Sequence, residues 1–265
     1  MVAMGERSGP FKYPRGEYRR NHVVWPGQEA ALEKFVRKRH QSLGMHKLAH
    51  AHSSHSEDAL TWSCFHCLAQ VDPAIRRRAL GELWEIAYDG ATLPDGVADG
   101  KICIGSDYGA GGESTEVDAS IDGERALTFV EAKLYSAMSQ ADLPRKPHNQ
   151  LAKKLRIGVQ AAMASNRDFY FILLDLAPRQ MLRRLNPGVS LDEATKQAPG
   201  GFASKWLTAY WFDRYHHARG GSLAPLREVL QDIPRADPTR VANHMGWLTW
   251  ADLFKVVLRA VVDNR

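Results

Sequence analysis

The sequence predicts an α/β fold in which a central mixed sheet is flanked by helices and the C-terminal part is mostly helical. Three observations support this prediction. Residues 101–134 contain short segments with strand-like alternation, separated by turn signals, and helical periods lie on both sides of them. Residues 169–174 form a nearly continuous apolar run, which is typical of a strand buried on both faces. The expected order is therefore helix, three strands, helix, strand.

Helical signals dominate the first hundred residues. Ser56 is predicted to cap a helix, because its hydroxyl can accept a hydrogen bond from a free N–H of the first turn. The acids Glu57 and Asp58 then suit the positive end of the helix dipole. A further helix is predicted over residues 73–88, where apolar side chains recur at helical spacing.

Strand signals fill the middle of the chain. Residues 101–104 predict one short strand, and residues 116–121 alternate with the period of a second. The dipeptide Asp122-Gly123 predicts a tight hairpin turn, which leads into a third strand over residues 126–134. The glycine-rich stretch 109–112 lacks the lysine of a phosphate-binding loop and is interpreted as a flexible connection between strands.

Composition restricts the class of protein. The 265 residues are 44% hydrophobic, enough for one sizeable core, and 35 Lys and Arg against 30 Asp and Glu make the chain basic. That balance suits a polyanionic partner and equally suits a slightly basic soluble enzyme. Three cysteines argue against a disulfide framework and for a reducing compartment. We expect a cytoplasmic protein, because no apolar run approaches the roughly 18 residues of a membrane span and no secretory signal begins the chain.

The triplet Glu131-Ala132-Lys133 is the candidate centre of chemistry. Residues two apart on a strand share a face, so Glu131 and Lys133 project from the same face. Burying their charged groups on the core side of a sheet costs free energy, which argues that they serve a function. Asp118 is expected on the preceding strand, and if the hairpin pairs about its midpoint, Asp118 lies within a few residues of Glu131 across the ladder. Two carboxylates beside one lysine suit a hard divalent cation such as Mg²⁺, and the lysine can then help to activate a bound water.

Context gives this triplet its weight, because an acid-x-Lys pattern alone is weak. Residues Asp99-Gly100-Lys101 form a second such pattern. The alternative interpretation is a surface ion pair on an edge strand. The apolar neighbours Phe129, Val130 and Leu134 argue against that alternative.

These residues resemble a known signature. Val117-Asp118, a spacer and Glu131-Ala132-Lys133 are similar to the motif of the PD-(D/E)XK nuclease superfamily, with its restriction-endonuclease-like core, although Val117 stands where many members have proline. The resemblance covers roughly residues 50–176. It implies a phosphodiesterase that acts on nucleic acid, usually DNA, with Mg²⁺ or Mn²⁺ as cofactor.

The resemblance also implies roles for two helices. Residues 56–62 resemble the first core helix of some members, which implies Glu57 as a metal ligand beside Asp118 and Glu131. The alternative for Glu57 is a charge that merely suits the helix start. Gln150 opens the helix after the triplet, where the resemblance implies a catalytic position near the scissile phosphate.

The same helix carries a basic cluster, Lys153, Lys154 and Arg156, which we expect on its flanks or outside, because Leu151 and Leu155 must pack inward. These residues predict contacts to DNA phosphates, and a solvated helix face is the equal alternative. The expected partner is double-stranded DNA. A homodimer is also expected, because cutting a duplex with one active site per chain usually requires two chains.

Three segments are expected: a basic N-terminal arm and helix over residues 1–45, a nuclease core over 46–180, and a helical extension packed on the core over 181–265. The predicted function is a metal-dependent DNA endonuclease, of the kind found in restriction or defence. One alternative is a catalytically inactive nucleic-acid-binding member of the same fold. Another is a glycosidase with paired carboxylates, which would leave Lys133 without a use.

Overall fold

The structure is a computed structural model. It describes the backbone of residues 15–38, 47, 51, 56–134, 136, 138–142, 147–176, 203–216 and 222–264, and the side chains of these residues apart from 15–16 and 203–206.

A five-stranded mixed sheet forms the centre of the molecule, with the strands side by side in chain order. The first three strands make an antiparallel meander, and the last two each run parallel to the strand before them. The strands are β1 (Lys101–Ala110), β2 (Glu113–Asp122), β3 (Ala126–Lys133), β4 (Asp168–Asp175) and β5 (Met245–Thr249). The predicted α/β class with a mixed sheet is therefore confirmed.

Glycines make the two hairpin turns of the meander. Gly111 and Gly112 have φ values of 58° and 80°, a conformation that lets two residues join β1 to β2. The expectation of a flexible connection over residues 109–112 is corrected here, since Gly109 and Ala110 belong to β1. Between β2 and β3, the N–H of Gly123 donates to the carbonyl of Ala126 at 2.9 Å, so the predicted second turn is confirmed.

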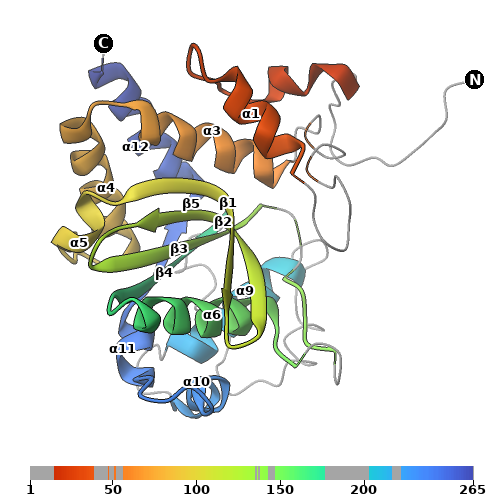
Figure 1. Cartoon of the computed structure of the whole chain (residues 1–265), viewed down its shortest axis with the longest axis vertical. Helices are drawn as coiled ribbons and strands as arrows, with labels where there is room; N and C mark the ends of the chain where they lie inside the picture. The colour runs from red at the N-terminus through yellow and green to blue at the C-terminus, as the bar shows by residue number, and fades with distance from the viewer. Residues whose placement is uncertain are drawn as a thin grey trace, which may run out of the picture.

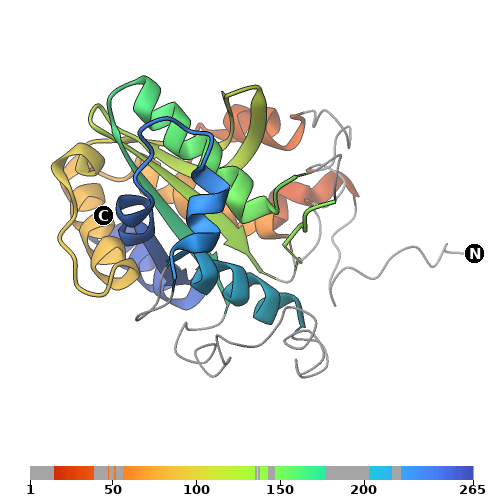
Figure 2. The same ribbon diagram turned by 90° about the horizontal axis from the view of Figure 1, so that it is seen from below.

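Helices cover both faces of the sheet, as Figure 1 shows. One face packs against α3 (Glu57–Gln70), α4 (Pro73–Ala87) and α12 (Trp250–Asp263), and the other packs against α6 (Gln150–Ala164). Figure 2 shows α9 and α10 on the side of α6. The remaining helices are η1 (Arg15–Asn21), α1 (Glu29–Val36), α5 (Asp95–Ala98), α9 (Ala203–His216), α10 (Ala224–Leu230) and α11 (Pro238–Asn243). No helix in the described ranges has both the length and the apolar character to cross a bilayer.

Helix α6 makes the crossover between the parallel strands β3 and β4. Asn149 caps its start by accepting a hydrogen bond from Ala152 N at 2.9 Å. Gly158 lets the helix approach the sheet closely, because a Cβ there would meet the Phe169 ring at 2.1 Å. Helix α6 therefore packs closely against β4, the strand that contains Phe169.

The last part of the chain contributes more than helices to the fold. The C-terminal part is mostly helical, as predicted, and it also supplies strand β5, which pairs with β4 and completes the sheet. The five residues of β5 are all buried and carry no alternation that would mark a strand. Residues 177–202, which include the expected boundary near residue 180, lie outside the described residues.

Candidate active site

The site begins where the β2–β3 ladder ends. The last pair of the ladder is Ala119 with Val130, so the same register places Asp118 opposite Glu131. The N–H of Ala132 donates a hydrogen bond to Asp118 Oδ2 at 2.8 Å rather than to a strand carbonyl. The Asp118 side chain thus takes over a hydrogen bond of the sheet, which fixes its carboxylate beside Glu131.

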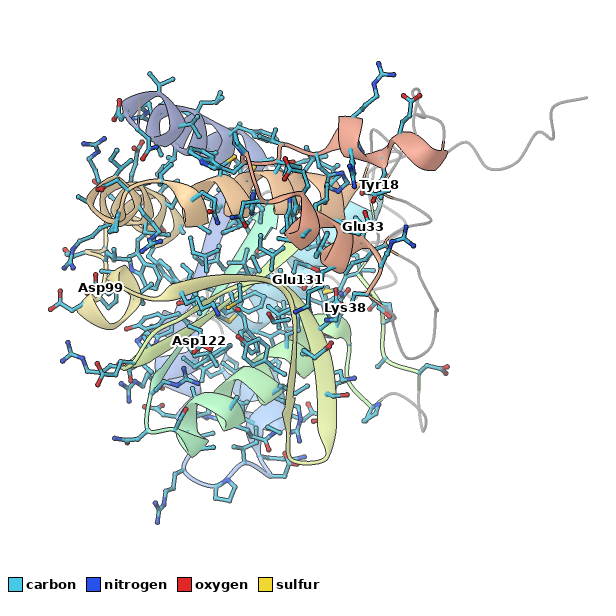
Figure 3. The ribbon with its side chains drawn as sticks, turned by 45° about the horizontal axis from the view of Figure 1, so that its top comes forward. Tyr18, Glu33, Lys38, Asp99, Asp122 and Glu131 are labelled. Atoms are coloured by element: carbon cyan, nitrogen blue, oxygen red, sulfur yellow. The ribbon has the colours of Figure 1, made fainter. Side chains whose placement is uncertain are left out.

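Glu131 and Lys133 share the sheet face that α6 covers, as strand periodicity predicts. Glu131 is 2% exposed and Lys133 is 4% exposed, and Lys133 Nζ lies 2.9 Å from Glu131 Oε1. In the competing acid-x-Lys triplet, the Asp99 side chain is 81% exposed and pairs with Arg77. Figure 3 shows Glu131 within the body of the molecule and Asp99 at its periphery. The interpretation of Glu131 and Lys133 as a surface ion pair is therefore wrong.

Helix α3 brings a third carboxylate to the site. Ser56 caps the helix as predicted, and the next residue, Glu57, accepts hydrogen bonds from Leu134 N at 2.6 Å and Ser136 Oγ at 2.8 Å. Lys133 Nζ lies 3.5 Å from Glu57 Oε1. The Lys133 ammonium group thus stands between the carboxylates of Glu131 and Glu57.

A second lysine completes the cluster, and it corrects an expectation. Lys154 was predicted on an outer basic face of α6, but it is 2% exposed and its Nζ contacts Glu131 Oε2. The same Nζ donates to the backbone carbonyl of Glu116 at 2.7 Å. The buried carboxylate draws the lysine inward, because an ion pair compensates the loss of hydration for both groups.

Arg156 is also buried, contrary to the same expectation. Its guanidinium lies 2.9 Å from Glu113, contacts Asp232 and donates to the Val229 carbonyl at 2.6 Å. These contacts tie α6 to β2 and to the segment after α10. Of the three expected DNA-binding residues, Lys153 alone keeps a partly exposed side chain.

The pKa values of the two facing carboxyl groups are shifted in opposite directions. Burial alone would raise the pKa of Asp118, but the positive charges of Lys154 and Lys133 outweigh it and lower the pKa to about 2. Burial raises the pKa of Glu131 to about 7, and the negative charge of Asp118 adds to that rise. The carboxyl groups lie close enough to share a hydrogen bond. At neutral pH Asp118 is therefore ionised, and Glu131 carries much of the proton population of the pair.

The lysine between the acids is held in its charged form. Burial alone would lower the pKa of Lys133, but the neighbouring carboxylates, led by Glu131, raise it well above its usual range. Burial also raises the pKa of Glu57, against the opposing charge of Lys133. Lys133 is therefore a donor of hydrogen bonds and positive charge at neutral pH.

Carboxylate oxygens are the ligands that Mg²⁺ and Mn²⁺ prefer, so the pair Asp118 and Glu131 fits such a cation. Within the described ranges no group of three or more His, Cys, Asp or Glu side chains is arranged to hold a metal ion, so the expected ligand set of Glu57, Asp118 and Glu131 stays a prediction. Glu57 is separated from Glu131 by the Lys133 ammonium group. The residues that could hold a metal are thus the facing pair, with Glu57 behind the lysine.

Gln150 takes a different place from the one expected. Its side-chain oxygen accepts a hydrogen bond from Ser139 N at 3.2 Å, so it is engaged with the loop before α6 rather than with the carboxylates. Two other contributions to the site were not predicted from the sequence: the contact of Trp250 and the inward position of Lys154. Trp250 Nε1 donates to the Lys133 carbonyl at 3.2 Å from a helix more than a hundred residues away. Lys154 gave one signal, since it follows the buried Leu151 by three residues and so shares its helix face.

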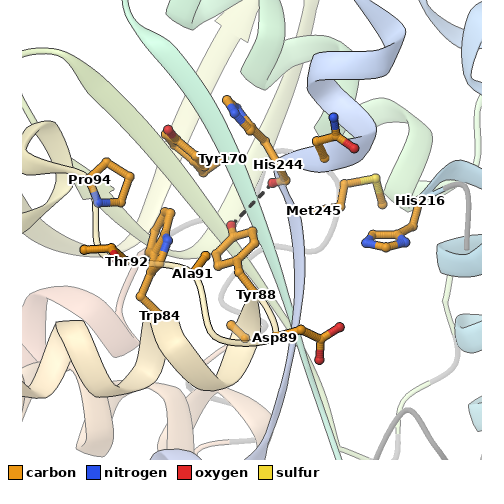
Figure 4. Close-up of a pocket in the computed structure, with 12 residues that line it drawn as sticks. Trp84, Tyr88, Asp89, Ala91, Thr92, Pro94, Tyr170, His216, His244 and Met245 are labelled. Carbon is orange, nitrogen blue, oxygen red and sulfur yellow. Dashed lines mark hydrogen bonds between the residues drawn. The ribbon is translucent and has the colours of Figure 1, made fainter.

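A separate pocket of about 280 Å³ lies at the amino ends of β4 and β5 (Figure 4). Tyr170 and His244 stack there with ring centroids 4.1 Å apart. Tyr88 donates hydrogen bonds to the carbonyls of Phe171 and His244 and so joins α4 to both strands. Tyr170 pairs with a β3 residue three positions before Glu131, so this pocket is distinct from the carboxylate cluster.

No family model matches the chain, and neither the curated proteins nor the solved structures contain a significant match.

Proposed function

We propose that this chain is a metal-dependent endonuclease that hydrolyses phosphodiester bonds in DNA, with Asp118, Glu131 and Lys133 at its active centre. The observation that carries the proposal is the facing of two carboxyl groups on adjacent strands, with a buried lysine beside them. Apolar side chains would stabilise this position as well or better, since burying charges rarely adds stability. A chemical role therefore accounts for the cluster better than a structural one. The resemblance to the PD-(D/E)XK motif supports the same function.

The roles of the three residues follow from their charges. Asp118 and Glu131 would hold one Mg²⁺ or Mn²⁺, which supplies Lewis acidity and a nucleophilic water when bound. Asp118 is ionised already, whereas Glu131 must lose its proton to join it. Lys133 stays protonated, so it donates hydrogen bonds and positive charge to the attacking water or to a phosphate oxygen rather than accepting a proton.

A cleavage assay on supercoiled plasmid DNA, with Mg²⁺ against EDTA, tests the proposal. Cleavage should require the metal, and Lys133→Ala should reduce the rate by at least about 100-fold, the lower end of typical acid–base contributions. Lys101→Ala is the matched control, because Lys101 ends the exposed acid-x-Lys triplet. Metal-dependent cutting by wild type that persists at full rate in Lys133→Ala would contradict the assignment to this cluster.

A catalytically inactive nucleic-acid-binding protein is the second candidate. Each oxygen of Glu131 lies against an ammonium group, which favours a cluster that serves as an ion pair only. Binding of DNA without metal-dependent cleavage would support this candidate. A glycosidase is less compatible, because its two carboxyl groups stand about 5–9.5 Å apart, whereas these are within hydrogen-bonding reach.

The partners and location follow from the same proposal. The substrate is double-stranded DNA, with Lys153 as the cation of the expected cluster that can still reach a phosphate. Two chains would act together, since each supplies one site and a duplex has two strands. A cytoplasmic location agrees with the three cysteines, which are all unpaired.

A further inference from the structure

Lys154 is the member of the cluster that no motif assigned. It projects from α6, whereas Glu131 and Lys133 belong to β3. Its Nζ has two partners among the described residues, Glu131 Oε2 and the Glu116 carbonyl. A carboxylate and a carbonyl are both oxygen ligands, so the ammonium group occupies a position that oxygen atoms line.

The two ammonium groups beside Glu131 oppose the binding of a cation to its carboxylate. Lys133 lies against Oε1 of Glu131 and Lys154 lies against Oε2. A cation held by Asp118 and Glu131 would therefore share a Glu131 oxygen with an ammonium group, and the repulsion between these like charges favours displacement of one ammonium group. When all groups are ionised, the acids Asp118, Glu131 and Glu57 exceed the two lysines by one negative charge, so a divalent cation cannot simply be added beside both lysines without an excess of positive charge.

Lys154 is the group that can leave. Lys133 sits between two carboxylates, 2.9 Å from Glu131 and 3.5 Å from Glu57, so its departure would uncover both. Lys154 contacts one carboxylate among the described residues, and its other partner, the Glu116 carbonyl at 2.7 Å, carries no net charge, so the ammonium group can move towards solvent once that contact breaks. Displacing Lys154 therefore breaks fewer ion pairs than displacing Lys133.

We propose that the Lys154 ammonium group is a built-in substitute for the metal, and that a divalent cation and Lys154 compete for Glu131 Oε2. This inference rests on the metal site of the proposed nuclease and extends it to the metal-free protein. The lysine keeps the buried Glu131 compensated when no cation is present. Binding of the cation then releases Lys154 from Glu131 and leaves Lys133 in place for catalysis.

Calorimetric titration with Mg²⁺ or Mn²⁺ alone tests the competition. Lys154→Met should bind the cation at least about tenfold more tightly than wild type, because a competing positive charge is gone; tenfold corresponds to about 1.4 kcal/mol. Titrations at about pH 8.5 keep the carboxyl groups ionised. Lys153→Met is the matched control, since it removes an equal charge from the neighbouring, partly exposed position and should leave the affinity near that of wild type. Equal affinity of Lys154→Met and wild type would overturn the proposal.

A measurement on the wild-type protein covers the case in which Lys154→Met does not fold. Lysine acetylation followed by mass spectrometry reports which amines solvent can reach. Lys154, which is 2% exposed, should react several-fold faster when Mg²⁺ saturates the protein, while Lys153 should react at the same rate with and without the metal. Unchanged protection of Lys154 in the metal-bound protein would overturn the exchange.

The outcomes also separate this inference from the nuclease proposal. Tighter cation binding by Lys154→Met in a protein that cuts no DNA would support the exchange and reject the nuclease. Metal-dependent cutting by wild type, with no gain in affinity in Lys154→Met, would reject the exchange alone. Absence of Mg²⁺ and Mn²⁺ binding by every variant would reject both.

Discussion

In the wild-type protein, the Glu131 carboxyl group should make the free energy of unfolding fall as the pH rises. Glu131→Gln should abolish this fall. The pKa of Glu131 is raised from 4.5 to about 7, chiefly by burial. Between these pH values the unfolded chain has released this proton while the folded chain retains it, so the free energy of unfolding falls as pH rises. A tenfold change in an ionisation constant corresponds to about 1.4 kcal/mol, so the loss amounts to about 3 kcal/mol once pH exceeds 7.

Urea denaturation in EDTA measures this effect. The unfolding free energy of wild type minus that of Glu131→Gln should fall by about 3 kcal/mol between about pH 4.5 and about pH 8. Glu124→Gln is the control, because Glu124 is exposed in the turn between β2 and β3 and carries the same change of charge. Its stability difference from wild type should stay nearly constant over that range.

Parallel curves for wild type and Glu131→Gln would refute the reasoning. They would mean that the folded protein ionises Glu131 as readily as the unfolded chain does. The two ammonium groups would then fully offset burial and the charge of Asp118, and the pKa of Glu131 would not be raised.

Three further predictions concern the site and its support. Asp118→Asn should lower the free energy of unfolding by about 2 kcal/mol at neutral pH and weaken Mg²⁺ binding in calorimetry. The reason is that the pKa of Asp118 is lowered from 3.8 to about 2, so the ionised carboxylate stabilises the fold above pH 3.8. This stabilisation is lost as the pH falls towards 2. Arg156→Ala should lower the unfolding free energy by about 1–3 kcal/mol, because the guanidinium is buried whereas its partner Asp232 is largely exposed. Lys153→Ala should leave the unfolding free energy unchanged and reduce the salt dependence of DNA binding by about 0.9 in log–log slope, measured by fluorescence anisotropy. Gly158→Ala should destabilise by about 1–3 kcal/mol in thermal melts, because its Cβ would meet an aromatic ring, whereas Gly81→Ala, in an open helical position, should be neutral or gain up to about 1 kcal/mol.

Local signals were sufficient for the part of the site that lies on the hairpin. The turn after Asp122 sets the register of β2 against β3, and that register alone brings Asp118 to Glu131. The period of a strand puts Glu131 and Lys133 on one face, and the Ser56 cap fixes where α3 begins. Each of these features depends on residues within about fifteen positions of one another, which is why the sequence predicts them.

Features that depend on distant partners could not be predicted. Helical periodicity assigns charged residues to the outer face of α6. Lys154 and Arg156 instead point inward, because they pair with carboxylates on β3, on β2 and in the segment after α10. Strand β5 is five buried residues between helices, and only its pairing with β4 makes it a strand. Tertiary contacts override local preference at both places.

The division of strand β3 into two halves explains why stability and chemistry should be separable in this protein. On the face that α6 covers, Leu127 and Phe129 are fully buried in an apolar cluster, and the next two residues on that face are Glu131 and Lys133. The change from apolar to ionic side chains coincides with the last pair of the β2–β3 ladder, after which Asp118 takes over a hydrogen bond of the sheet. The apolar half holds the strand in register independently of the charged groups, so the fold can persist when one of those groups is changed. Conservative changes at the ionic end should therefore shift the free energy of unfolding without unfolding the protein, while they remove metal binding and cleavage, which is the pattern that the proposed nuclease requires.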